Sequence, residues 1–63
     1  MQATVKHWDP ATRDGTVLTD DGHELAFPGA AVQVRALRPG QRVQLRTDGD
    51  QVVALTLSTL PFL

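Results

Sequence analysis

The chain is short and nearly neutral, with 63 residues, a formal net charge of −1 and no cysteine. A chain of this length forms one small domain, and without cysteine it has neither disulfides nor thiolate metal sites. It has no apolar run near the roughly 20 residues of a membrane span and no signal-peptide core, so we expect one cytoplasmic domain, residues 1–63, with an apolar tail at 58–63.

Residues 3–8 (ATVKHW) open with β-branched side chains and predict a first strand. Asp9-Pro10 ends this strand, because proline has no N–H to donate and restricts the residue before it. Residues 10–14 then form the turn into a central hairpin over residues 15–28. The hairpin turn is Asp20-Asp21-Gly22, since glycine and aspartate tolerate the positive φ of a tight loop.

The length of this hairpin loop decides which side chains face inward. With Asp21-Gly22 as a two-residue loop, Leu18 pairs with Leu25 and Thr16 pairs with Phe27, so these four side chains share one face. A three-residue loop shifts the pairing and moves the side chains of one strand relative to those of the other. Both registers remain open.

The second half of the chain adds two further strands. Residues 30–37 are ambiguous between one helical turn and a short extended piece, and Pro39-Gly40 predicts a turn. Residues 41–47 alternate, which places Val43 and Leu45 inward, and an Asp48-Gly49 turn leads into a last strand over residues 51–57. Five short strands without a useful helix predict a small antiparallel all-β barrel of the OB type.

The remaining tail, residues 58–63, is apolar. We expect it to pack over the open end of the barrel. The alternative is an exposed patch of Leu60, Phe62 and Leu63 that contacts a protein partner or a second copy of the chain.

The order of these motifs resembles that of the bacterial cold-shock domain, a five-stranded OB-type barrel that binds single-stranded RNA and DNA. The resemblance covers residues 3 to about 57. The matching pieces are Thr4-Val5-Lys6, Gly15, Asp20-Asp21-Gly22, Gly29-Ala30-Ala31-Val32 and Leu37-x-x-Gly40-Gln41-x-Val43. Members of that family stack bases on aromatic side chains of two neighbouring strands, rimmed by basic residues.

This chain departs from the family at most of the stacking positions. The two phenylalanines of the first family motif correspond to Asp14 and Thr16, and the aromatic pair of the second corresponds to Ala26 and Pro28. The exposed tryptophan of the first family strand corresponds to His7, and Trp8 holds the next aromatic position. Each stacked base contributes about 1–3 kcal/mol, so losing four platforms predicts nucleic-acid binding that is weaker by about three decades.

Positive charge is concentrated in the second half. Residues 30–47 contain four arginines and no acid, a net charge of +4, whereas residues 1–29 carry −3. The segment is either a local phosphate-contacting patch or a set of solvated strand ends. With the resemblance it completes a predicted single-stranded nucleic-acid site consisting of Lys6, His7, Trp8, Arg13, Thr16, Arg35 and Arg38.

Trp8 and Phe27 also have structural interpretations. Trp8 is either one half of a residual stacking pair with His7 or a half-buried barrel residue, and Phe27 is expected in the core. His23 is expected in solvent, and the two histidines lack the companions that a metal site needs.

No nucleophile–base set and no phosphate loop can be assembled, so we expect neither an enzyme nor a cofactor. The alternative function is a former cold-shock barrel used for protein contact or self-association.

Overall fold

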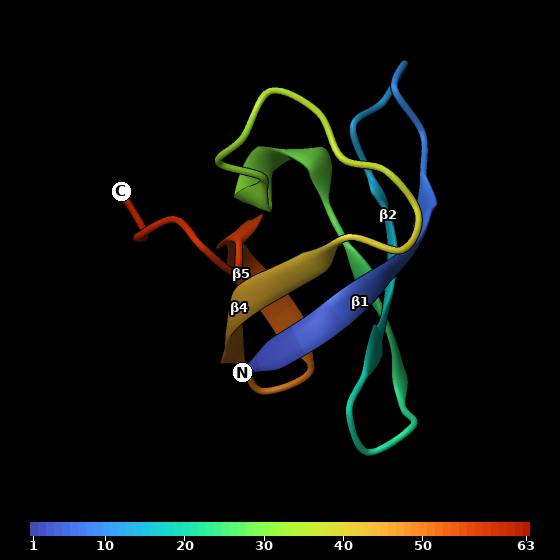
Figure 1. Cartoon of the computed structure of the whole chain (residues 1–63), viewed down its shortest axis with the longest axis vertical. Coiled ribbons are helices and arrows are strands. Elements are labelled where there is room, and N and C mark those ends of the chain that lie inside the picture. Colours follow the sequence, from blue (N-terminus) through green and yellow to red (C-terminus); the bar gives the residue numbers. More distant parts are fainter.

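The computed structural model describes all 63 residues and contains five strands in one antiparallel sheet (Figure 1). The strands are β1 (Gln2–Trp8), β2 (Gly15–Thr19), β3 (Glu24–Phe27), β4 (Arg42–Asp48) and β5 (Gln51–Leu57), in the order β3-β2-β1-β4-β5. A three-residue 3₁₀ helix, η1 (Gly29–Ala31), follows β3. The predicted all-β class is confirmed. The structure holds no helix that is long and apolar enough to cross a membrane.

The sheet curls until its edge strands, β3 and β5, lie against each other. They share no ladder of hydrogen bonds, so the arrangement is consistent with an OB-type barrel that is not closed. The segment after η1 fills part of the gap, because Val32 forms a parallel bridge with Leu55 and the Gln33 N–H donates to the Leu55 carbonyl at 2.8 Å. The ambiguous stretch 30–37 therefore contains both predicted alternatives, one helical turn and one extended contact.

The core is apolar and is built from alternate strand positions. On β4, Val43 and Leu45 point inward as predicted. Phe27 is only 2% exposed, which confirms its predicted place in the core. The buried cluster consists of Ala3, Val5, Val17, Phe27, Ala31, Val32, Leu37, Val43, Leu45, Val52 and Leu55.

The central hairpin adopts the register of the three-residue loop, so the two-residue alternative was wrong. Thr16 pairs with Ala26 and Leu18 with Glu24. The cause lies at Thr19, whose N–H donates to the His23 carbonyl while its hydroxyl accepts the His23 N–H at 3.0 Å. Thr19 and His23 thus close a loop of residues 20–22, in which Gly22 has a φ of +90°.

This register changes which face each side chain occupies. Val17 and Thr19 point into the core beside Leu25 and Phe27, whereas Thr16 and Leu18 point outward. Leu18 is 44% exposed, whereas in the two-residue-loop register it would have shared a face with Phe27, which is buried. The second hairpin also turns one residue later than predicted, since Gly49 and Asp50 form the loop between Asp48 and Gln51.

The C-terminal tail contacts the outward side of β4, and its last residue reaches the segment after η1, where the Leu63 N–H donates to Gln33 Oε1 at 2.8 Å. The Gln44 amide donates to the Leu60 carbonyl, and the Arg46 guanidinium carbon lies 4.5 Å from the centroid of the Phe62 ring. These contacts hold the tail to β4 side chains that point away from the barrel core. Leu63 is 95% exposed, and a partner for the tail stays a prediction.

Candidate nucleic-acid interface

A β-bulge in β1 decides where Trp8 points. Val5 pairs with Val17 and His7 pairs with Thr16, so Lys6 is an extra residue between them. Strict alternation from Ala3 and Val5 would have turned His7 inward. With the bulge, Lys6 and His7 are both exposed and Trp8 lies on the inner side.

Trp8 stacks on Phe27 across the strand that separates them. The ring centroids are 6.3 Å apart and the planes differ by 16°, an offset stack. Gly15 of β2 pairs with Trp8 on one side and with Phe27 on the other, so the two rings meet above a residue without a side chain. A Cβ at Gly15 would lie 3.0 Å from the Phe27 ring and would collide with the His7 carbonyl.

Trp8 is half-buried and packs against the core cluster, as its structural interpretation predicted. His7 is on the opposite face, in a cross-strand row with Thr16 and Ala26. The two side chains do not form one stacking surface. The outward face of β1–β3 carries no phenylalanine, tyrosine or tryptophan, so it offers His7 as its one ring.

Arg13 joins the loop after β1 to the loop before β4. Its guanidinium donates to the carbonyls of Val34 and Arg35, each at 2.7 Å. The guanidinium carbon lies 5.8 Å from the centroid of the Trp8 ring. Its backbone is left-handed, with a φ of +64°, a conformation that non-glycine residues adopt at a cost of about 1 kcal/mol or more. The Arg13 N–H donates to the Asp9 carbonyl at 2.7 Å, which holds the loop in this shape.

The loop that Arg13 holds carries Arg35 and leads to Arg38. Arg38 opens the Pro39-Gly40 turn, whose Gly40 N–H donates to the Val5 carbonyl of β1 at 2.7 Å. Loop 33–41 therefore runs from Arg13 to the middle of β1 (Figure 1). Both arginine side chains are exposed, and neither has a carboxylate partner.

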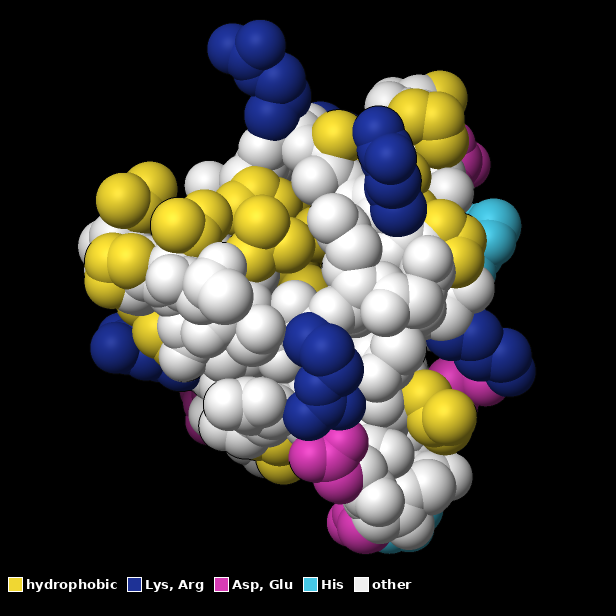
Figure 2. All heavy atoms as spheres, in the orientation of Figure 1, with side chains coloured by type: hydrophobic (Ala, Val, Ile, Leu, Met, Phe, Trp, Pro, Cys, Tyr) yellow, Lys and Arg dark blue, Asp and Glu magenta, His cyan; other side chains and the backbone are white.

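The predicted residues therefore fall into two groups. Trp8, Arg13 and the loop arginines Arg35 and Arg38 form what we call the arginine edge. The other group, Lys6, His7 and Thr16, lies on the outward face of the sheet. Figure 2 shows the Lys and Arg side chains as separate projections on the face drawn there, without a continuous basic surface.

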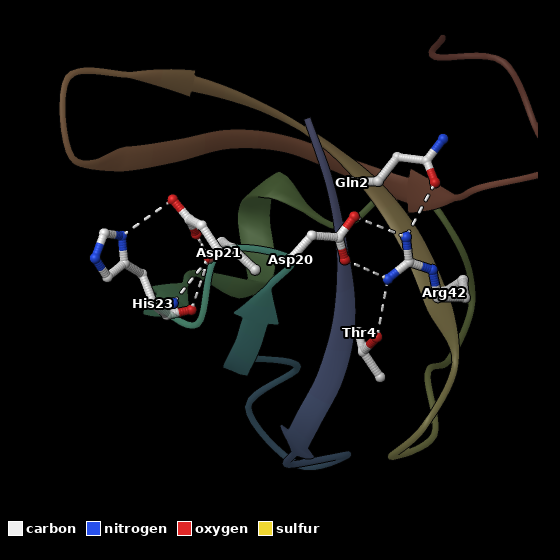
Figure 3. Close-up of polar contacts among 7 residues, drawn as sticks. Gln2, Thr4, Asp20, Asp21, His23 and Arg42 are labelled. Atoms are coloured by element: carbon white, nitrogen blue, oxygen red, sulfur yellow. Dashed lines mark hydrogen bonds and ion pairs between the residues drawn. The ribbon is translucent and has the colours of Figure 1, made fainter.

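Sequence reasoning missed a polar network on this outward face (Figure 3). Arg42 binds Asp20 with both arms of its guanidinium, at 2.8 and 3.2 Å, and also donates to Thr4 Oγ1 at 3.1 Å and Gln2 Oε1 at 3.3 Å. Lys6 makes the other Lys/Arg–carboxylate ion pair of the protein, with Glu24. The partners are far apart in sequence, so no local signal indicated either contact.

The hairpin carboxylates predict how stability depends on pH. The hydrogen bond from Arg42 lowers the pKa of Asp20, and the hydrogen bond from the Thr19 hydroxyl lowers that of Asp21, both from an ordinary value of 3.8. At acid pH the unfolded chain therefore binds more protons than the folded chain. The two carboxylates stabilise the fold above pH 3.8, and this stabilisation is lost as the pH falls through their lower pKa values in the folded protein.

We therefore expect the unfolding temperature to fall steadily below pH 3.8, measured by circular dichroism. Asp20→Asn should flatten this acid slope. Asp50→Asn, which removes an exposed carboxylate without an ion pair, should leave it unchanged. An acid slope equal in the wild type and Asp20→Asn would contradict the assignment.

The surface contains no pocket, and no three His, Asp or Glu side chains lie close enough to hold a metal ion. The candidate surfaces are the arginine edge and the network on the outward face; a further polar contact joins His23 Nδ1 to Asp21 Oδ2 at 3.4 Å in the hairpin loop. No protein-family model, curated protein or solved structure matches the chain.

Proposed function

We propose that the protein binds single-stranded RNA or DNA weakly and with little sequence preference, at the arginine edge. The observation that carries the proposal is the contact of Arg13 with loop 33–41. It brings the loop that carries Arg35 and Arg38, two arginines without carboxylate partners, against Arg13 and the half-buried Trp8. The resemblance to cold-shock domains supports the same function. A cytoplasmic location belongs to this proposal.

The chemistry of the edge suits a flexible polyanion. Arg35 and Arg38 have no carboxylate partner and are free to bind phosphate with their planar forks, and a base would stack on the part of the Trp8 ring that Phe27 and Arg13 leave exposed. Stacking on one base adds only about 1–3 kcal/mol and does not depend strongly on base identity. The outward face lacks further aromatic platforms, which accounts for the expected weakness.

The proposal predicts a strong dependence of affinity on salt. Two phosphate contacts on a single strand, at Arg35 and Arg38, give a slope of about −1.4 in log K against log salt, or about a sevenfold loss between roughly 50 and 200 mM. The measurement is a titration of a mixed-sequence single-stranded 12-mer, as RNA and as DNA, followed by Trp8 fluorescence.

Two single variants locate the site. Arg35→Gln and Arg38→Gln should each weaken binding about fivefold to tenfold at roughly 50 mM salt, because each removes one phosphate contact. Arg46→Gln is the matched control, since Arg46 lies on Phe62 of the tail and is outside the arginine edge. Equal losses in all three variants would show that only net charge matters, and an absence of binding by the wild type would overturn the proposal.

A further inference from the structure

The network on the outward face contains two cations that are held by carboxylates of one hairpin. Arg42 of β4, Thr4 of β1, Leu18 of β2 and Glu24 of β3 are paired in turn, which places them in one row across four strands. Neighbouring strands are about 4.8 Å apart, so the row spans about 14 Å. Lys6 reaches Glu24 at the far end of this row.

Both acids come from the β2–β3 hairpin, and both cations come from strands outside it. Asp20 directly follows β2 and binds Arg42, whereas Glu24 opens β3 and binds Lys6. The middle of the row, Thr4 and Leu18, carries no charge. The hairpin thus neutralises a face that would otherwise carry two positive charges.

These ion pairs are open to exchange with another anion. The side chains of Lys6 and Glu24 are 59% and 48% exposed, and those of Arg42 and Asp20 are 43% and 67% exposed. Exposed ion pairs contribute little to stability, and a phosphate presents two oxygens to an arginine fork as a carboxylate does. Thr4 Oγ1, next to the Arg42 guanidinium, can donate to the same phosphate.

We propose that this outward face is a masked phosphate path: Asp20 and Glu24 occupy Arg42 and Lys6, and the phosphodiester backbone of a single strand bound at the arginine edge displaces them. The inference rests on the proposed function, because the strand that reaches Lys6 and Arg42 is the one held by Arg35 and Arg38. Arg38 connects the two surfaces, since the turn that it opens is bonded to Val5, beside Lys6. The hairpin carboxylates then set the affinity by competing with the ligand.

The test is the double variant Asp20→Asn/Glu24→Gln, which keeps the shapes of the side chains and removes both competitors. Because the ligand no longer has to break two exposed ion pairs, the double variant should bind the 12-mer about fivefold more tightly than the wild type at low salt. In the wild type each displaced carboxylate takes up a cation while the strand releases one, so removing both carboxylates should also steepen the salt slope, by at most about 1.4. The matched control is Asp48→Asn/Asp50→Asn, which raises the net charge equally at the β4–β5 turn, where neither carboxylate has an ion pair.

The outcomes separate this inference from the proposed function. A gain for Asp20→Asn/Glu24→Gln that exceeds the control, with a steeper salt slope, supports the masked path. If the wild type binds and both double variants behave alike, the masked path is wrong and the proposed function stands. If the wild type does not bind and only Asp20→Asn/Glu24→Gln does, both are wrong, because the masked path requires a strand held at the arginine edge to displace the carboxylates. If none binds, both are wrong. Thermal unfolding of each variant confirms that the proteins compared are folded.

Discussion

Gly15→Ala is expected to leave the protein largely unfolded at room temperature. The new Cβ would collide with the His7 carbonyl, lie 2.9 Å from the His7 carbonyl carbon and press against the Phe27 ring at 3.0 Å. The added Cβ has no space between the backbone on one side and the buried ring on the other. We therefore expect the free energy of unfolding to fall by about 3 kcal/mol or more. A domain of this size has about 3–5 kcal/mol of stability in total. Far-UV circular dichroism and urea unfolding measure the loss.

Gly22→Ala is the matched control for this substitution. Gly22 has a φ of +90° in the hairpin loop, and nothing lies within 4 Å of an added Cβ. The control therefore introduces only the strain of a left-handed alanine, about 1 kcal/mol. Equal losses for the two variants would mean that Trp8 and Phe27 do not meet above Gly15 as described.

Phe27→Ala is expected to destabilise the protein by about 3–5 kcal/mol. Phe27 is buried in the core, and its loss leaves a cavity and removes the stacking partner of Trp8. This loss equals the whole stability of a domain of this size, so the variant should be largely unfolded in far-UV circular dichroism. The Trp8 emission maximum at zero denaturant should then lie at the longer wavelength of an indole in water.

Leu18→Ala separates the observed register from the alternative. In the two-residue-loop register, Leu18 would share the inward face with Phe27, and its truncation would be costly. In the structure Leu18 is exposed beside Thr4 on the outward face, so we expect the free energy of unfolding to change by no more than about 0.5 kcal/mol. A loss of about 2 kcal/mol or more would favour the other register.

Local signals in the sequence were sufficient to predict the strands. The predicted strand over 3–8 became Gln2–Trp8, and the one over 51–57 has the predicted bounds. Turn residues and alternating apolar side chains act over a few residues, so they are visible without tertiary structure. The fold class followed from the number and spacing of these strands.

The register and the bulge could not be predicted in the same way. The hydroxyl of Thr19 decides the loop length by bonding His23, and threonine at that position is equally compatible with both loops. The bulge at Lys6 depends on pairing between β1 and β2 and has no glycine or proline to mark it. It nevertheless decides whether His7 or Trp8 enters the core.

The candidate site was predictable as a set of residues but not as a surface. Trp8, Arg35 and Arg38 were identified by residue type and by the resemblance, and they lie along the arginine edge. The role of Arg13 was not predictable, because it depends on a left-handed backbone and on carbonyls about 20 residues away. The contact between Arg42 and Asp20 depends on a register that the sequence left open.

The most direct test of the account is an NMR titration of the ¹⁵N-labelled protein with the single-stranded 12-mer at about 50 mM salt, a concentration at which phosphate contacts are little screened. Binding at the arginine edge should give saturable shifts of the Trp8 indole N–H and of the backbone amides of Arg13, Arg35 and Arg38. The Gly49 and Asp50 signals at the β4–β5 turn should stay in place. Unchanged signals at the arginine edge, or shifts confined to the tail at residues 60–63, would contradict it.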